Sequence, residues 1–281
     1  MPFTEVADRV WVSRYPWFDV NVTVVGGQRG LVVVDTHASA AAAREVVADV
    51  RALGAGEVVA VVNTHEHFDH TFGNATFAEE YDDLPIHATD EAAARTVTAG
   101  ERIMEQYRAS TDPRAAEVLA TAILPANRTF SSAAVIDIGD RQVELVHPGR
   151  GHTAGDLVVR VPDADVLLAG DLVEESAPPA FGADSFPLEW AQTLDLVLGL
   201  LTPASVVVPG HGAVVDRGFV EEQCDGIRAV GETIRDLASR GVPLAEALAS
   251  AEWPYPTESL EDAVRIGYAQ LPRGARRLPL V

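Results

Sequence analysis

The chain has 281 residues, of which 47% are hydrophobic and 22% charged, a balance typical of a folded globular protein. Its formal net charge of −21 argues against a nucleic-acid partner, because neutralising phosphates requires a basic surface. Every cationic side chain other than histidine is an arginine, and the absence of lysine excludes a catalytic lysine, a Schiff base and a P-loop lysine.

The sequence carries no feature typical of secretion or membrane insertion. Its one cysteine is Cys224, so a disulfide scaffold is excluded. No apolar run approaches the roughly 20 residues that span a bilayer. Residues 1–6 lack the basic start and apolar segment of a signal peptide. We therefore expect a cytoplasmic protein with no membrane partner.

Short β-branched runs alternate with a helical segment in the first part of the chain. Residues 20–27 predict an edge hairpin that leads into a buried strand at 31–35. The Ala-rich segment 38–53 ends at Gly54 and predicts a helix, and residues 58–62 predict a second buried strand. This strand–helix–strand order indicates an α/β layered fold.

A similar set of elements follows after a more helical insert at about 90–124. A helix at 188–201 and a strand at 205–208 complete this second set. The tail from residue 218 onward has a helical pattern, broken at 253–256 by two prolines. Four strands precede the helix at 188–201, and they are predicted at 135–138, 143–146, 157–161 and 166–169.

Three histidines and an aspartate crowd into the six residues from His65 to His70. Imidazole nitrogens and carboxylate oxygens are the preferred ligands of zinc and its neighbours, whereas buried unpaired imidazoles are costly. Residues two apart in an extended segment point the same way, so His65 and His67 are expected to bind one ion. Asp69 and His70 follow on the turn and are candidates for a second ion.

Three more metal-compatible residues each follow a β-rich apolar run, and each lies beside glycine. They are expected in the turns after those strands, because such turns gather along one edge of a layered α/β fold, where ligands bind. Residues that are distant in sequence are therefore expected to converge there. The three residues are His152, Asp171 and His211.

The pattern His65-x-His67-x-Asp69-His70, followed in order by His152, Asp171 and His211, resembles the metallo-β-lactamase superfamily over about residues 5–215. The resemblance implies a four-layer αβ/βα sandwich with a two-metal site. In that site His65, His67 and His152 would hold the first ion, Asp69, His70 and His211 the second, and Asp171 would bridge them. We expect a catalytic domain at 1–217 and a helical extension at 218–281 packed on the same domain.

The resemblance also implies the chemistry. Two divalent ions, expected to be zinc with iron or manganese as alternatives, would share a hydroxide that attacks a small ester, thioester or lactone carbonyl. Asp69 would orient this hydroxide and accept its proton. Asp171 makes a glyoxalase II-like or lactonase-like hydrolase the expected type, because dedicated β-lactamases usually lack a bridging aspartate. Asp35 resembles the aspartate that braces the metal loop from outside, although a capping or turn role is the alternative.

Several alternatives stay open at this point. An iron persulfide dioxygenase on the same fold would use His65, His152 and Asp171 with one metal, and a phosphodiesterase would act on a small phosphoester. A non-catalytic binding protein is the alternative outside the enzymes. The partner expected for the hydrolase is a small-molecule substrate, and a homodimer is the commonest assembly.

For the aromatic residues near the motifs, a pocket-lining role and a packing role are equally supported by the sequence. Phe68 either lines the substrate pocket or packs beneath the metal loop. Phe181, Phe186 and Trp190 either wall a pocket beside Asp171 or anchor the loop and the helix that follows it.

Overall fold

The computed structural model describes residues 2–271. The first half contains β1 (Thr4–Ala7), β2 (Val10–Tyr15), β3 (Val20–Gly27), β4 (Gly30–Val34), α1 (Ala40–Leu53), β5 (Val58–Val62), α2 (Phe68–Thr71), α3 (Asn74–Glu80), β6 (Ile86–Thr89), α4 (Asp90–Arg108), α5 (Ala115–Leu119) and β7 (Arg128–Phe130). The second half contains β8 (Ala133–Asp137), β9 (Gln142–Val146), β10 (Val158–Val161), β11 (Val166–Glu174), α6 (Trp190–Leu200), β12 (Val206–His211), α7 (Arg217–Ser239), α8 (Leu244–Ala247) and α9 (Glu261–Gln270).

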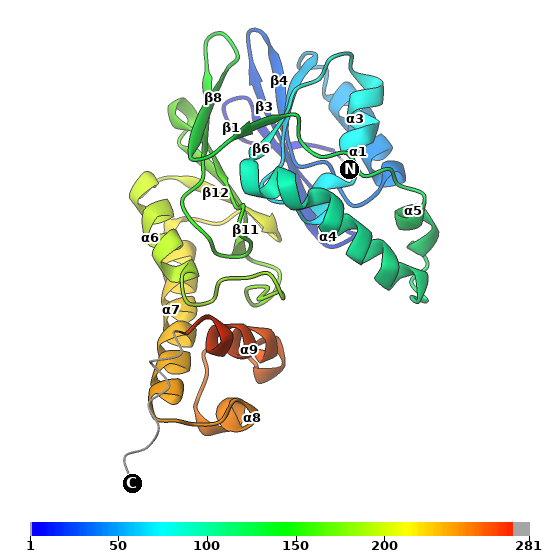
Figure 1. Cartoon of the computed structure of the whole chain (residues 1–281). Helices are drawn as coiled ribbons and strands as arrows, with labels where there is room; N and C mark the ends of the chain where they lie inside the picture. Colours follow the sequence, from blue (N-terminus) through cyan, green and yellow to red (C-terminus); the bar gives the residue numbers. More distant parts are fainter. Residues whose placement is uncertain (1, 272–281) are drawn as a thin grey trace.

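The strands form two half-sheets that meet along one thin seam (Figure 1). The strand order is β7-β6-β5-β4-β3-β12-β11-β10-β9-β8, and β2 pairs with β3 and with β1. At the seam, β3 and β12 pair only through Val20 and His211. Parallel pairing of β4 with β5 and of β11 with β12 places two strand ends of each half at the same edge.

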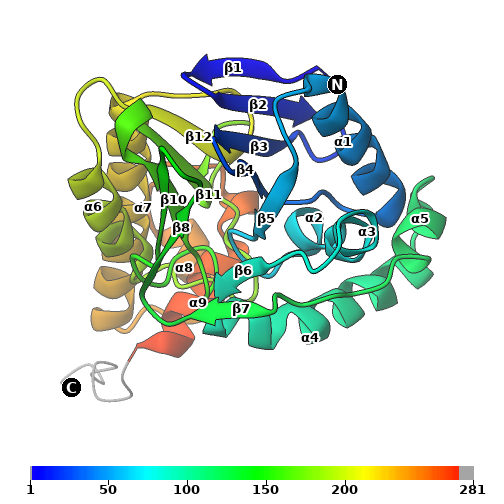
Figure 2. The ribbon, with the colours of Figure 1, turned by 90° about the horizontal axis from the view of Figure 1, so that it is seen from above.

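Four layers pack on one another in the order helix, half-sheet, half-sheet, helix, as expected. Figure 2 shows the strands between α1 and α3 on one side and α6 and α7 on the other. Alternation along β4 illustrates the cause: Leu31 and Val33 join a core with α1, whereas Val32 and Val34 join a core shared with the other half-sheet. A third core lies between β11, β12 and the helices α6, α7 and α9.

The predicted helix at 38–53 is confirmed as α1. Ser39 caps it, because its side-chain oxygen accepts a hydrogen bond from the Ala42 N–H. Gly54 ends it in the left-handed region at φ 65°, where a residue without Cβ is favoured. The buried face of α1 carries Val46 and Val50 and covers the first half-sheet.

Three strand predictions need correction. The strand predicted at 205–208 continues as β12 to His211, so His211 ends that strand and does not lie in the turn after it. Residues 20–27 do form a hairpin with β4, but β3 is not an edge strand, because β2 and β12 also pair with it. The strand predicted at 166–169 continues to Glu174, so Asp171 lies within β11 rather than in a turn. The reason is a left-handed bend at Gly170, with φ 52°, which shifts the register without ending the strand.

Helices occupy the insert and the tail, as predicted. The insert contains α4 and α5, and the tail contains α7, α8 and α9, with a break before α9. The tail shares its hydrophobic core with α6, β11 and β12, but the division at residue 217 stays a prediction. Residues 272–281 of the expected extension lie outside the described residues.

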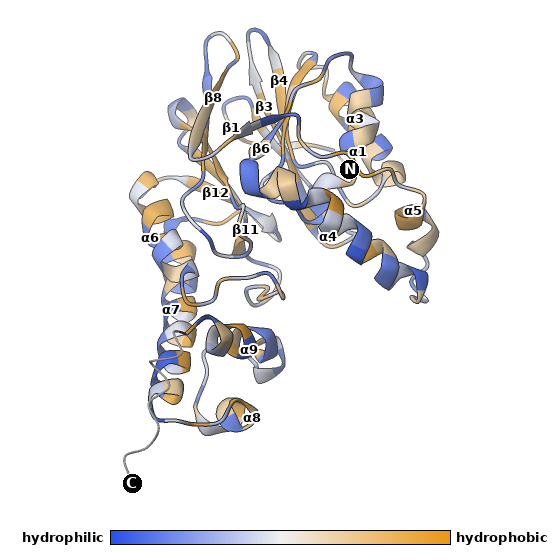
Figure 3. Ribbon diagram, viewed as in Figure 1, coloured by the Kyte–Doolittle hydropathy of each residue, from blue (hydrophilic) through white to orange (hydrophobic). Residues whose placement is uncertain are grey.

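Hydropathy follows this layering. Figure 3 shows hydrophobic residues along β4 and a mixture of hydrophilic and hydrophobic residues along α4 and α7. Within residues 2–271, no helix combines the length and the apolar character that a membrane span requires.

Candidate metal centre

The His65–His70 cluster lies directly after the buried strand β5. His65 and His67 occupy the extended segment before α2, and their ring centroids are 4.7 Å apart. Asp69 and His70 lie in α2, which begins at Phe68. The cluster therefore lies at the edge of the sheet where β5 ends. Its two pairs, His65 with His67 and Asp69 with His70, face the same region.

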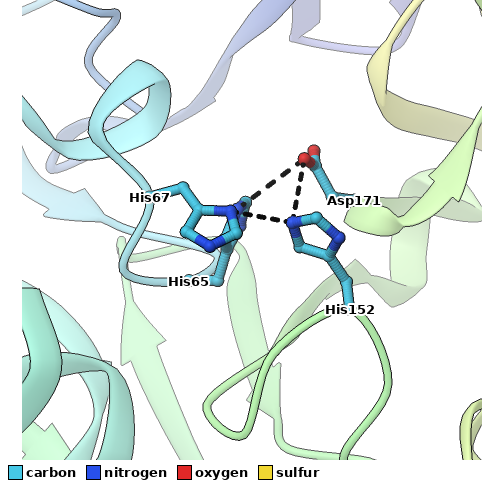
Figure 4. Close-up of side chains that lie close together, drawn as sticks. All are labelled: His65, His67, His152 and Asp171. Atoms are coloured by element: carbon cyan, nitrogen blue, oxygen red, sulfur yellow. Dashed lines mark hydrogen bonds and ion pairs between the residues drawn. The ribbon is translucent and has the colours of Figure 1, made fainter. Parts of the chain in front are cut away.

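The other three candidates arrive from the second half-sheet. His152 lies in the loop between β9 and β10, Asp171 lies within β11, and His211 is the last residue of β12. Because β11 and β12 are parallel neighbours, Asp171 and His211 emerge at the same edge. Figure 4 shows His65, His67 and His152 directed toward the Asp171 carboxylate. All seven predicted residues are thus brought together.

Two groups form around Asp171, and the potential ligand atoms within each lie within 4.8 Å of one another. His65, His67, His152 and Asp171 form the first group, and Asp69, His70 and His211 form the second. One oxygen of Asp171 faces each group. Its Oδ2 lies 3.7 Å from His65 Nε2 and 3.4 Å from His152 Nε2. Its Oδ1 lies 3.2 Å from His70 Nε2 and 3.3 Å from His211 Nε2.

Each of the five histidines has one ring nitrogen held by a protein oxygen, which leaves the other nitrogen facing the centre. Such contacts fix the orientation and tautomer of metal-binding imidazoles. The partners are Thr64 Oγ1 for His65 (3.1 Å), Asp184 for His67 (3.3 Å), Asp35 for His70 (2.8 Å), the Ala180 carbonyl for His152 (2.9 Å) and the Phe18 carbonyl for His211 (2.7 Å).

The inward-facing atoms fit a bound cation. His65 Nε2 and Asp171 Oδ1 are buried, and within the described residues neither makes a hydrogen bond of good geometry, although two imidazole nitrogens lie within 3.3 Å of Asp171 Oδ1. Unsatisfied buried polar atoms are rare in folded proteins, and a bound ion would satisfy these two. The donor set of five imidazoles and two carboxylates suits zinc, iron or manganese.

Electrostatics in the second group also favour a cation. Burial opposes a charge on His211, but Asp171 and Asp69 outweigh it and raise the pKa of His211 to about 10. Burial likewise opposes a charge on His70, yet the carboxylates around it raise its pKa well above the ordinary value. In return, these histidines hold the pKa of the buried Asp171 well below its usual range. The surrounding carboxylates therefore stabilise positive charge at this position.

The first group contains histidines that are neutral at pH 7. Burial lowers the pKa of His152 to about 4 and lowers the pKa of His65 well below its ordinary value. A neutral imidazole offers a lone pair to a metal ion. His67 differs: burial opposes its charge, but the hydrogen bond to Asp184 and the charges of the neighbouring carboxylates together outweigh burial and raise its pKa.

Asp35 contacts the cluster from behind. Its carboxylate accepts hydrogen bonds from the backbone and hydroxyl of Thr64 at 2.8 and 2.9 Å and from His70 Nδ1 at 2.8 Å. Its backbone is left-handed, with φ 64°, a conformation that costs about 1–3 kcal/mol for a residue with a side chain. Asp35 thus lies where the resemblance places a brace, and its effect on metal affinity stays a prediction.

Glu174 belongs to the site although the sequence contains no signal for it. Its carboxylate lies with Asp171 and His211 in a third group of potential ligands. Burial and the neighbouring Asp171 charge raise the pKa of Glu174 to about 7. In a regular strand, residues three apart face opposite sides. The register shift between Gly170 and Glu174 is what brings Asp171 and Glu174 together.

The aromatic residues after β11 anchor the loop instead of lining the neighbouring pocket. Trp190 is fully buried, donates a hydrogen bond to the Leu172 carbonyl, and packs with its ring centroid 5.8 Å from that of His152. Phe181 packs against Trp190, and the ring of Phe186 lies beneath the guanidinium of Arg150.

A pocket of about 370 Å³ lies beside the first group of ligands. Phe68 belongs to its wall and is also buried in a hydrophobic cluster with Phe72 and Val118, so it both lines the pocket and packs beneath the metal loop. Four segments far apart in sequence contribute: the metal loop, α4 of the insert, the loop between β11 and α6, and α9 of the tail. The lining residues are His67, Phe68, Asp69, Ala99, Arg102, Ile103, Gln106, Ala183, Asp184 and Asp262.

The family model described as "Metallo-beta-lactamase superfamily" matches residues 15–211, which include all seven candidate ligands. The chain belongs to this superfamily. Metallo-beta-lactamase type 2 from Bacillus cereus is 27% identical to it over 73% of this chain and 72% of that protein. A linear primary-alkylsulfatase from a Pseudomonas strain is 26% identical over 71% of this chain and 43% of its own length.

Solved structures confirm the fold over nearly the whole chain. The sec-alkylsulfatase Pisa1 from Pseudomonas sp. superposes with a TM-score of 0.75 at 18% sequence identity. The match covers 96% of this chain and 50% of that one. The predicted α/β fold is therefore confirmed, and the family model confirms the predicted membership in the metallo-β-lactamase superfamily.

Proposed function

We propose that this chain is a binuclear metal-dependent hydrolase of small esters, thioesters or lactones. The observation that carries this proposal is the position of Asp171, whose two oxygens face two separate groups of histidines. A carboxylate in that position can bridge two ions, whereas a mononuclear site requires only one of the groups. Zinc is the metal we expect, and iron or manganese would suit the same donors.

The residues of the chain have separate parts in this proposal. His65, His67, His152 and Asp171 would hold one ion, and Asp69, His70, His211 and Asp171 the other. Two such ions would lower the pKa of a shared water and polarise a carbonyl oxygen. Asp69 both faces the second group and lines the pocket, so it is placed to orient the attacking water and to accept its proton. Phe68 and Ile103 would exclude bulk water from the bound substrate.

A sulfate ester is the second candidate substrate class. The Pseudomonas relative is named an alkylsulfatase, and the Pisa1 structure matches the helical tail as well as the metal-binding part. A small phosphoester and the iron persulfide dioxygenase remain the alternatives on the same ligands. The expectation that Asp171 separates this chain from dedicated β-lactamases stays a prediction.

Elemental analysis of protein purified without added metal, followed by a hydrolase panel on the same sample, tests the proposal. The panel should contain aryl esters, a thioester, lactones, a β-lactam, bis-4-nitrophenyl phosphate and 4-nitrophenyl sulfate. We expect two metal ions per chain and turnover of the carbonyl substrates. Stoichiometric iron with thiol-dependent oxygen consumption would instead support the dioxygenase.

Replacing the carboxylate of Asp171 by an amide tests its bridging role directly. Asp171→Asn should lose at least one ion per chain and at least about a hundredfold in kcat/KM, since even outer contacts of a metal site are worth 10–100-fold. Asp195→Asn is the control, because Asp195 is a half-exposed residue of α6 that pairs with Arg228. An Asp171→Asn variant with the parent's metal content would contradict a bridging role.

A further inference from the structure

The pocket beside the metal ligands contains one cation among its described lining residues, Arg102 of α4. The other charged members of its wall, apart from the histidine, are Asp69, Asp184 and Asp262. The whole chain is strongly acidic, with a formal charge of −21, so the surface at large repels anions. Any selection of an anionic substrate must therefore come from groups inside the pocket.

Each carboxylate of the pocket already lies beside a nitrogen of another side chain. Asp69 Oδ2 lies 3.4 Å from His211 Nε2 and faces the second metal group. Asp184 lies 3.3 Å from His67 Nε2 and 3.0 Å from Arg102 Nη2. Asp262 accepts two hydrogen bonds from Arg265 of its own helix. Each of the three therefore already has a partner in the described part of the chain.

Arg102 retains unused donors. Its Nη2 donates to Asp184, whereas its Nε and Nη1 have no hydrogen-bond partner within residues 2–271. Its side chain is 52% exposed, so it is accessible from the pocket. Gln106 lies one helical turn further along α4 and lines the same pocket, and its amide group has no side-chain partner in that part of the chain either. A guanidinium fork beside an amide suits an anionic oxygen group.

We propose that Arg102, assisted by Gln106, binds an anionic oxygen group of the substrate, such as a carboxylate, away from the scissile bond. The apolar side chains of Phe68 and Ile103, which lie in the same wall, suit a short hydrocarbon link between the two ends of the substrate. The pocket would thus select small esters or lactones that carry a negative charge. This inference rests on the proposed hydrolase function.

Two esters with the same leaving group test whether the pocket selects a negatively charged substrate. We would compare kcat/KM for 4-nitrophenyl acetate, which is neutral, with that for mono-4-nitrophenyl glutarate, which ends in a carboxylate. In Arg102→Ala the ratio of glutarate ester to acetate ester should fall about tenfold to a hundredfold, the range expected for a hydrogen-bonded charge pair. Arg102→Lys should recover part of the loss, because the charge remains.

Arg95→Ala is the matched control, because Arg95 lies on the same helix, is 48% exposed, and pairs with Glu91 outside the pocket. It should keep the parent's ratio. An Arg102→Ala variant with the parent's ratio would overturn the inference. A loss of both esters together with bound metal would also overturn it, because Arg102 would then act through Asp184 on the metal ligand His67.

Calorimetric titration of zinc-loaded protein with glutarate separates this inference from the hydrolase proposal. Arg102→Ala should weaken glutarate binding at least tenfold, and Arg95→Ala should leave it unchanged. If the parent binds glutarate in this way but cleaves no ester, the hydrolase proposal fails and the anion site stands. If glutarate does not bind, or binds equally to parent and Arg102→Ala, the anion site is wrong.

Discussion

At the scale of single residues, the bridging position of Asp171 depends on the absence of a side chain at Gly210. A Cβ at residue 210 would lie 1.9 Å from Asp171 Oδ1, far inside van der Waals contact. Gly210→Ala should therefore displace the carboxylate and lower metal affinity at least about tenfold, a loss typical of a misplaced metal-site group. Competition with a chelator measures this affinity.

Gly199 provides the control for this substitution. It lies in α6, and a Cβ there would meet nothing within 4 Å, so Gly199→Ala should keep the metal and stabilise the fold by about 0.5–1 kcal/mol. Parent-like metal affinity in Gly210→Ala would mean that Asp171 does not need this close approach.

Most, but not all, residues of the site could be predicted from the sequence. The seven candidate ligands were identifiable because they lie at or after the ends of apolar runs and because their order resembles that of the metallo-β-lactamase superfamily. The structure places them together. Glu174 and Asp184 were not identifiable, because a register shift and a loop conformation bring them to the site. Those features depend on tertiary packing and leave no period in the sequence.

At the scale of elements, the loop that carries His152 is held by the buried Asp156. Its carboxylate accepts hydrogen bonds from the N–H and the hydroxyl of Thr153, at 2.7 to 3.0 Å. Burial outweighs these bonds and raises the pKa of Asp156 to about 8, against 3.8 for an unperturbed aspartate. The folded state therefore binds a proton between pH 4 and 8 that the unfolded chain has lost, so this group's contribution to stability falls as pH rises through that window.

Asp156→Asn removes the titration while keeping an acceptor for Thr153. In metal-free protein, urea unfolding should show the parent losing stability relative to Asp156→Asn from pH 5 to pH 8, with the difference levelling off above about pH 8. Asp163→Asn, which changes an exposed partner of Arg141, serves as the control for a lost carboxylate. A constant difference between parent and Asp156→Asn would show that Asp156 keeps the same charge across this range.

Element prediction succeeded where the hydrophobic pattern was strong and local. The buried strands β4, β5 and β9 and the helix α1 appear close to their predicted bounds, since apolar runs and caps mark them. The role of β3 was wrong, because β2 was not anticipated as its outer neighbour. The length of β11 was also wrong, because Gly170 was interpreted as the start of a turn, whereas a glycine inside a strand can mark a bend that the strand continues through.

At the scale of the whole molecule, the helical tail and the metal-binding part share one core. Ile227 of α7 is fully buried in the cluster that also contains Trp190 of α6 and Val207 of β12. The tail also contributes Asp262 to the pocket. Unfolding of the tail would expose the helical side of β11 and β12, the two strands that carry Asp171 and His211. Cytoplasmic location and a homodimer stay predictions.

Ile227→Ala should therefore destabilise the entire protein, by about 2–5 kcal/mol for a large-to-small change in a core. Leu196→Ala is the control, because Leu196 is 58% exposed on α6 and its loss should cost under about 0.5 kcal/mol. Urea unfolding followed by both far-UV circular dichroism and tryptophan fluorescence should show one transition that moves as a unit in Ile227→Ala. Two transitions, of which only one moves, would mean that the tail unfolds separately from the strands that carry the metal ligands.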